Sequence, residues 1–443
     1  MKRFLLAGCA VAALAYGVGS ANAADVPNGK FQILMGGDAF FQAGAVSQDR
    51  SSDQRVTEFN NRFRLVITPQ AKADNGITYG ARLRIRAAGL NAAPNTPNSA
   101  VDHDRAFLFA EGKFGRVEAG GVNSPNDQAY AVGMTGHPMD FQALAIYDAW
   151  QLFTRNDQRA NTLNNTAAGA GVVDGLAFSQ WTGGASTVGY QLPVAANAGT
   201  RVNYFTPRFS GFQATFSYLP RTDSNAVDVT RGSIVTNATP FSSNFQDVYE
   251  IGANYTNTFN GWKVQGGVAY VGGDASKGVS SATNLNKFHD LSAVQAGMNV
   301  SYSGFTLGGG YLYMGKSGYT KAPYIDRTGT TKAATAAGNV TTKLSDQQSW
   351  NVGVQYATGS QANAGTVVAG VKFASYQDAG NLAVAGKRTT DAVTFGAMYT
   401  IAPGFLGGME GTFYENKSDR AKAAAFSPSD SGSVWLLRSA VVF

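Results

Sequence analysis

Apolar and polar residues alternate with a period of two along several stretches of the chain. In residues 249–255, aromatic and aliphatic side chains occupy the odd positions, whereas Glu, Gly and Asn occupy the even ones. Residues 262–270, 350–356 and 393–399 repeat this alternation. Successive side chains of a β-strand point to opposite faces, so one face of each stretch suits lipid and the other suits water. Amphipathic strands of about 10 residues or more are typical of membrane barrels, whereas strands of soluble sheets average about 5–6 residues.

The segments that connect these stretches alternate between short and long. The short connections, several of them rich in Asn and Gly as hairpin turns are, lie at residues 73–76, 112–115, 208–211, 260–261, 303–304, 359–363 and 402–404. The long, polar connections lie near residues 45–57, 90–100, 124–199, 221–245, 273–288, 315–346, 378–388 and 417–431. The pattern predicts an all-β fold, an antiparallel up-and-down transmembrane barrel of sixteen strands with short periplasmic turns and long extracellular loops. Eighteen strands is the alternative if residues 172–192 contribute a further pair.

The N-terminus has the form of a secretory signal peptide. Lys2 and Arg3 precede an apolar run that ends near Val18, and small residues precede the expected cleavage after Ala23. An alternative interpretation, a lipoprotein box ending at Cys9, leaves an apolar region too short for that purpose. We therefore predict a signal peptide over residues 1–23 and a single barrel domain over residues 24–443. Removal of the signal peptide would also remove the only cysteine, and with it all thiol chemistry.

The composition supports export to a membrane and argues against a soluble protein, a helical membrane protein and a nucleic-acid-binding protein. Only 14% of the residues are charged, whereas soluble domains contain about 25%. After the signal peptide, no apolar run approaches the ~20 residues of a transmembrane helix. The formal charge of +6 could suggest nucleic acid as a partner, but export separates the chain from it.

The C-terminal residues 434–443 form another alternating stretch, which ends in Phe443. This last strand must pair with the first, near residues 31–43, to leave no open edge. A terminal Phe on such a strand resembles the signal by which outer-membrane proteins are recognised for assembly. Phe443 is therefore the predicted assembly signal.

Two hairpins resemble those of the general Gram-negative porins. Residues 104–120 contain Arg105, aromatic residues and the Gly-Lys-Phe-Gly turn at 112–115, and residues 202–214 contain a Tyr, a Pro and the run Phe-Ser-Gly-Phe at 209–212. The two motifs flank the third long loop, residues 124–199, which is longer than is typical of that family. The resemblance implies an outer-membrane homotrimer whose third loop folds into the lumen. It further implies contact with outer-membrane lipid, and with periplasmic chaperones and the barrel assembly machinery during biogenesis.

Motifs for catalysis or cofactor binding are weak. Residues 310–317 match the phosphate-binding P-loop pattern, but an alternating strand fills its first half and no helix is predicted after its lysine. His103 lies between two aspartates, which resembles a metal half-site, although a solvated strand end explains this cluster more simply. We find no nucleophile motif and no distinctive pair of carboxylates. We predict no catalytic residue, no cofactor and no metal site, and therefore no enzyme.

Five arginines form the one charge cluster above background. Arg62 and Arg64 share a face of the second strand, and Arg82, Arg84 and Arg86 share a face of the third. An arginine that faces lipid at mid-depth costs about 2–4 kcal/mol, so all five should face the lumen. At ~3.3 Å per residue and a tilt of about 40°, Arg82 lies ~15 Å above the turn at residues 75–76, near mid-height. A purely structural ladder of ion pairs is the alternative.

The third long loop carries the opposite charge. Residues 124–199 contain five aspartates and only two arginines. If part of this loop folds inward, its acids would face the arginines across the narrowest point of the lumen. We expect Asp140 and Asp148, near the middle of the loop, to be the acids of this constriction.

These features predict a porin: a water-filled channel for passive diffusion of small hydrophilic solutes and ions, since barrels of 16–18 strands leave an aqueous lumen. A substrate-selective outer-membrane channel is one alternative. An adhesin-type or structural barrel without an open pore is another. An energy-coupled receptor would need a plug domain before the first strand, which begins near Phe31 and leaves no room for one.

Overall fold

The structure is a computed structural model of the 443-residue chain. It describes residues 29–49, 55–87, 101–125, 149–154, 199–223, 231, 235–237, 244–275, 277–279, 285–286, 288–319, 324–325, 331–332, 345–379, 387–418 and 429–443. The predicted signal peptide, Asp140 and Asp148 lie outside these residues.

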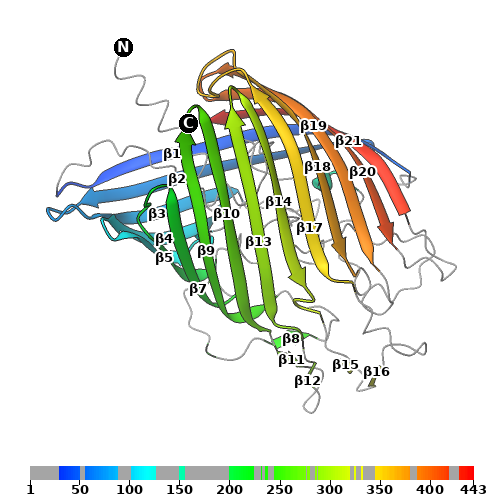
Figure 1. Cartoon of the computed structure of the whole chain (residues 1–443), viewed down its shortest axis with the longest axis horizontal. Coiled ribbons are helices and arrows are strands. Elements are labelled where there is room, and N and C mark those ends of the chain that lie inside the picture. The colour runs from blue at the N-terminus through cyan, green and yellow to red at the C-terminus, as the bar shows by residue number, and fades with distance from the viewer. Residues whose placement is uncertain are drawn as a thin grey trace.

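Sixteen antiparallel strands close into one barrel, in which each strand pairs with the next along the chain and the last pairs with the first (Figure 1). The strands are β1 (Gln32–Gln48), β2 (Thr57–Lys72), β3 (Thr78–Ala87), β4 (Val101–Gly112), β5 (Gly115–Gly121), β6 (Thr200–Phe205), β7 (Phe212–Arg221), β9 (Phe245–Phe259), β10 (Trp262–Ala275), β13 (Leu291–Tyr302), β14 (Phe305–Gly315), β17 (Gln347–Ala357), β18 (Val367–Asp378), β19 (Arg388–Ala402), β20 (Phe405–Ser418) and β21 (Ser429–Val442). The predicted fold class and the count of sixteen are confirmed.

The seven predicted turns all join neighbouring strands at one end of the barrel. Two of them, Asn260-Gly261 and Ser303-Gly304, have positive φ at both residues. Two-residue hairpins need this conformation because its twist matches that of the flanking strands. Glycine takes the second position of both turns, and Asn260 and Ser303 adopt the same left-handed conformation at the first.

The opposite end of the barrel carries short strands that the sequence pattern does not predict. β11 (Lys277–Val279) pairs with β8 (Val235–Asn237) and with β12 (Leu285–Asn286), and β15 (Tyr324–Ile325) pairs with β16 (Thr331–Lys332). All five lie in segments predicted as long loops, and Figure 1 shows them together beyond the ends of the barrel strands. They are only two or three residues long, which is too short for an alternating pattern to be recognised.

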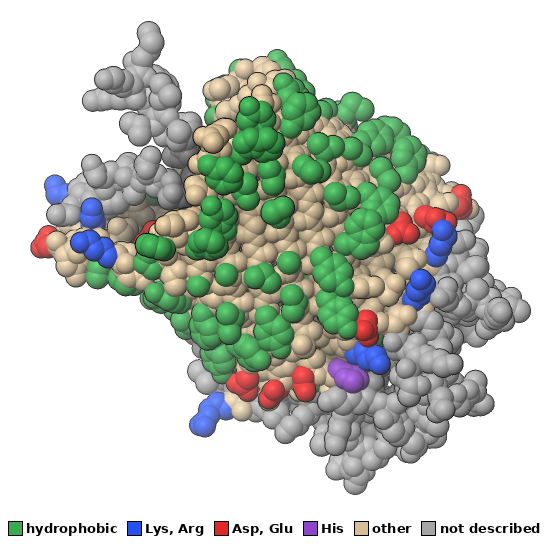
Figure 2. All heavy atoms as spheres, viewed as in Figure 1, with side chains coloured by type: hydrophobic (Ala, Val, Ile, Leu, Met, Phe, Trp, Pro, Cys, Tyr) green, Lys and Arg blue, Asp and Glu red, His purple; other side chains and the backbone are tan. Residues whose placement is uncertain are grey.

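The outer face of the barrel wall is apolar. On β9, Tyr249 and Ile251 are exposed, whereas Glu250 and Asn254 are buried on the inner face. Figure 2 shows hydrophobic side chains over the outer wall, with acidic side chains along the rim next to the loops. In the part of the chain that the structure describes, no helix is long and apolar enough to cross a membrane.

The C-terminal residue closes the barrel, as its position in the sequence predicts. The backbone N of Gly37 donates to the carbonyl O of Phe443 at 2.7 Å, and the N of Phe443 donates to the O of Gly37 at 3.1 Å. The Phe443 ring lies 6.3 Å from that of Phe63 on β2. A side chain on Gly37 would overlap the Arg64 carbonyl and crowd the Phe443 ring, so glycine is required there.

Deletion of Phe443, or its replacement by Ser, is expected to lower the amount of folded barrel in the outer membrane. The deletion removes two closing hydrogen bonds, and either change removes a terminal aromatic ring from the last strand. Heat-modifiable mobility and protease resistance of outer-membrane fractions would measure the loss, with Phe443→Tyr as the conservative control. Equal amounts of folded barrel in all variants would contradict the assignment of Phe443 as an assembly signal.

Candidate functional site

An arginine pair and one aspartate occupy the inner face of the first two strands. Asp38 of β1 lies opposite Arg64 of β2. Arg62 donates from Nη2 to Asp38 Oδ2 at 2.7 Å, and Arg64 donates from Nε to Asp38 Oδ1 at 2.7 Å. The side chains of Arg62, Arg64 and Asp38 are only 13%, 16% and 10% exposed. One carboxylate therefore serves two guanidinium groups in a largely buried position.

The arginines of β3 continue this cluster across the barrel wall. Arg86 lies directly opposite Arg64, and Arg84 lies between Val66 of β2 and Arg105 of β4. We call the set Arg62, Arg64, Arg82, Arg84, Arg86, Arg105 and Asp38 the basic wall. Like charges directly across from each other destabilise a sheet. The basic wall therefore places two unfavourable arginine pairs on the inner face of the barrel.

Elsewhere on the inner face, ion pairs are formed within the wall. Arg116 donates to Glu118 at 2.8 Å on β5, and Arg438 of β21 contacts Glu410 of β20 at 3.1 Å. Arg388 of β19 donates from Nη2 to Asp378 Oδ2 of β18 at 2.6 Å, and both side chains are fully buried. In each of these three pairs an acid of the wall contacts an arginine of the same or the neighbouring strand, whereas Asp38 of the basic wall contacts two arginines.

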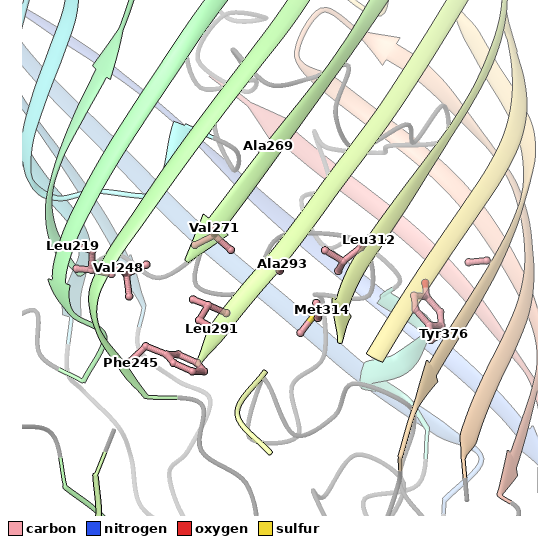
Figure 3. Packing of buried hydrophobic residues seen from close by; sticks show 11 residues of the cluster. Leu219, Phe245, Val248, Ala269, Val271, Leu291, Ala293, Leu312, Met314 and Tyr376 are labelled. Atoms are coloured by element: carbon pink, nitrogen blue, oxygen red, sulfur yellow. The ribbon is translucent and has the colours of Figure 1, made fainter. Parts of the chain in front are cut away.

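The inner face near the loops is apolar over another part of the barrel. Buried side chains from β7, β9, β10, β13, β14 and β18 form one cluster close to the loop ends of these strands (Figure 3). Its members are Leu219, Phe245, Val248, Ala269, Val271, Leu291, Ala293, Leu312, Met314, Ala374 and Tyr376. The arginines of the basic wall are partly exposed, whereas this cluster is fully buried. The two regions of the inner wall therefore differ both in charge and in the exposure of their side chains to solvent.

A model of the Gram-negative porin family matches residues 10–419, which is nearly the whole chain. The chain belongs to the Gram-negative porin family. As a porin, it is a barrel protein of the outer membrane that crosses the bilayer with many strands.

Several other proteins are similar to this chain. An uncharacterized protein of Rickettsia conorii is 24% identical over 92% of this chain and 91% of its own, and one of Rickettsia felis is 23% identical over the same shares. Among solved structures, OmpT of Vibrio cholerae, an outer-membrane protein in its trimer form, is 10% identical, covers 93% of this chain and 99% of its own, and has a TM-score of 0.50. A mutant of the Rh. blastica porin is 14% identical, covers 93% of this chain and 100% of its own, and has a TM-score of 0.49.

The structure of this porin brings together the arginines that the sequence pattern singles out. Arg62 and Arg64 lie on β2, and Arg82, Arg84 and Arg86 lie on β3, with Arg64 and Arg86 in direct register. Their predicted acidic partners, Asp140 and Asp148, lie outside the described residues. The predicted role of all seven in a constriction therefore stays a prediction.

Two residues of the basic wall were missed by the sequence pattern. Arg105 appeared only as part of a hairpin motif, although it shares its phase with Phe107 and Phe109, whose side chains are buried on the inner face. The regular register of β3 and β4 places it opposite Arg84, and a register shift follows at Ile85, which lies opposite His103. Asp38 was missed because it is a single acid on the first strand. Asp38, Phe40 and Gln42 are two residues apart on β1, so their side chains lie on the same face, which is buried. This period of two is the signal that could have placed Asp38 on the inner face.

The weak motifs for other chemistry find no support in the geometry. Gly310 and Gly315, the glycines of the P-loop match, belong to strand β14, and a turn follows at residues 316–318. Among the described residues, no three His, Cys, Asp or Glu side chains come together as metal ligands do. That the porin binds no cofactor and catalyses no reaction stays a prediction.

Proposed function

We propose that this porin forms a water-filled channel through which small hydrophilic solutes and ions diffuse passively across the outer membrane. The observation that carries the proposal is the basic wall: a set of charged, partly exposed side chains on the inner face of a barrel whose outer face is apolar. Charged groups on an inner wall require water or counter-charges beside them. A barrel of sixteen strands is also too wide for its own wall side chains to fill.

We further propose that the basic wall is one side of the constriction. Its partly exposed arginines would attract anions, and acids of the third loop, with Asp140 and Asp148 as candidates, would face it. Opposite charges across a narrow lumen with low-dielectric walls produce a strong transverse field. The gathering of six arginines on neighbouring strands of the inner wall supports a preference for anions.

We infer that the porin assembles as a homotrimer through the outer faces of β4, β5 and β6. β5 has 7 residues and β6 has 6, compared with 17 in β1. At ~3.3 Å per residue and a tilt of about 40°, strands of this length give roughly 15–18 Å of height, less than the ~25 Å apolar band of a barrel. The outward residues Val117 and Ala119 are small and suit close contact between protomers. OmpT of Vibrio cholerae, which has a similar fold, occurs in a trimer form.

Single-channel recording of the purified porin in a planar lipid bilayer tests this proposal. We expect an ohmic, long-lived conductance that appears in groups of three equal steps, because each trimer carries three lumens. The absence of conductance from folded barrel would favour the structural or adhesin-type alternative. A conductance that one solute blocks in a saturable manner would favour the substrate-selective channel.

A further inference from the structure

Six residues of the long connection between β5 and β6 lie against a distant part of the barrel wall. Residues Ala149–Leu152 form the short 3-10 helix η4, and Phe153 and Thr154 complete its turn. This turn contacts β21, and it belongs to one buried apolar cluster with residues of β1, β19, β20 and β21. Four strands, β4, β3, β2 and β1, separate β5 from β21 in the order of the barrel. The connection therefore reaches a distant part of the inner wall.

Two aromatic side chains make the contact. Trp150 is completely buried, and its ring stacks on that of Tyr414 with centroids 5.0 Å apart and planes at 23°. Phe153 lies directly over Gly44 of β1, where the Cβ of any other residue would overlap its ring. Val46, Ala392, Val434 and Leu436 complete the apolar surroundings. We call Gly44 and Tyr414, with these four neighbours, the aromatic seat.

The wall holds the aromatic seat in a defined position. The Tyr414 hydroxyl donates to Asp430 Oδ2 at 3.2 Å and accepts a hydrogen bond from Gln48 Nε2 at 2.8 Å. These contacts tie β20 to β21 and β1 at the point where Trp150 stacks. The turn also stabilises itself, since Phe153 N donates to Trp150 O at 3.0 Å and Thr154 Oγ1 donates to Gln151 O at 2.8 Å.

We propose that the aromatic seat is the anchor that holds the third long loop across the lumen and thereby sets the conductance of the channel. This inference rests on the proposed channel function and assigns positioning roles to Trp150, Phe153, Gly44 and Tyr414. A long loop fixed only at its two ends has many conformations. The entropic cost of closing such a loop rises only slowly with its length, so its two ends alone do not hold it in one position. Fixing residues 149–154 on a distant wall divides the loop into two shorter spans. The aromatic seat then fixes the point at which the loop is held to the inner wall.

A reversible cross-link tests the anchor within a single protein. In a chain with Cys9→Ala, Gly44→Cys and Phe153→Cys place two thiols where glycine and the aromatic ring now meet. We expect a disulfide to form in the folded porin, and the oxidised channel to keep the wild-type conductance. Reduction in the bilayer removes the cross-link and leaves the aromatic seat without Phe153, so unitary conductance and current noise should both rise.

The outcomes separate the anchor from the channel function. Failure of the disulfide to form in folded barrel overturns the occupancy of the aromatic seat. A disulfide that forms, with equal conductance before and after reduction, overturns the anchor and leaves the channel function standing. A wild-type porin without any conductance overturns the channel function, and with it this inference.

A pair of matched tryptophan variants checks the same point without cysteines. Trp150→Ala removes a stacked ring from the aromatic seat, and Trp262→Ala removes a ring that stacks on Tyr302 at 4.5 Å on the exposed outer face. We expect both variants to give heat-modifiable barrel, and only Trp150→Ala to change unitary conductance. Equal conductance of the two folded variants would overturn the anchor.

Discussion

Replacing Arg82, Arg84 and Arg86 together by glutamine is expected to shift the reversal potential of the channel toward cation preference. The triple variant removes three cations from the basic wall and keeps Asp38 with its two arginines, Arg62 and Arg64. The effect should depend strongly on salt, because the Debye length falls from about 30 Å at 0.01 M to about 3 Å at 1 M ionic strength. Reversal potentials in salt gradients at low and high ionic strength measure it.

A second triple variant provides the matched control. Arg55, Lys113 and Lys417 are exposed cations at strand ends and in a turn, so their replacement by glutamine changes the net charge equally. We expect this control to leave ion preference nearly unchanged. If the β3 variant folds and its conductance and ion preference equal those of the wild type, the basic wall is not the selectivity filter.

The arrangement of the barrel could be predicted from the sequence because two independent patterns mark each strand. Alternation assigns the faces, as in Tyr249 and Glu250, and the turn residues locate the ends, as in Asn260-Gly261. Alternation also predicts that the arginines of β3 face inward. If the strand were turned so that Arg84 faced lipid, the barrel would lose free energy of folding. These signals are local, and they do not depend on which strand lies next to which.

Contacts between strands could not be predicted in the same way. The pairing of Asp38 with two arginines depends on the exact register of β1 and β2, and the position of Arg105 opposite Arg84 depends on the register of β3 and β4. The apolar inner cluster could not be predicted either. Leu312 and Met314 face inward and Tyr311 and Tyr313 face outward, so both faces of β14 are apolar here and the alternation of apolar and polar residues disappears. Trp150 gave no signal, since a single aromatic residue in a loop has no periodicity.

Neutralising one partner of the buried ion pair between Asp378 and Arg388 is expected to destabilise the barrel more than any other single change of charge. The two residues lie directly opposite each other on β18 and β19, and their side chains are 0% and 1% exposed. Two hydrogen bonds join them, at 2.9 Å from Nε and 2.6 Å from Nη2. Burial raises the pKa of the neighbouring Tyr319 well above its usual range, so this phenol carries no charge that could replace the carboxylate.

Asp378→Asn should therefore remove the carboxylate that lies opposite a buried guanidinium and lower the free energy of unfolding by about 3–5 kcal/mol. The double variant Asp378→Leu with Arg388→Met removes both charges and should recover most of that loss, because well-packed apolar residues can replace a buried ion pair. Equilibrium urea unfolding of barrel refolded into lipid vesicles measures both. The exposed pair of Arg55 and Glu58, with side chains 80% and 54% exposed, is the control, and its loss should change stability by about 0–1 kcal/mol. A similarly small effect of Asp378→Asn would mean that water reaches the Asp378–Arg388 pair, and the loop end of β18 and β19 would then belong to the wet lumen.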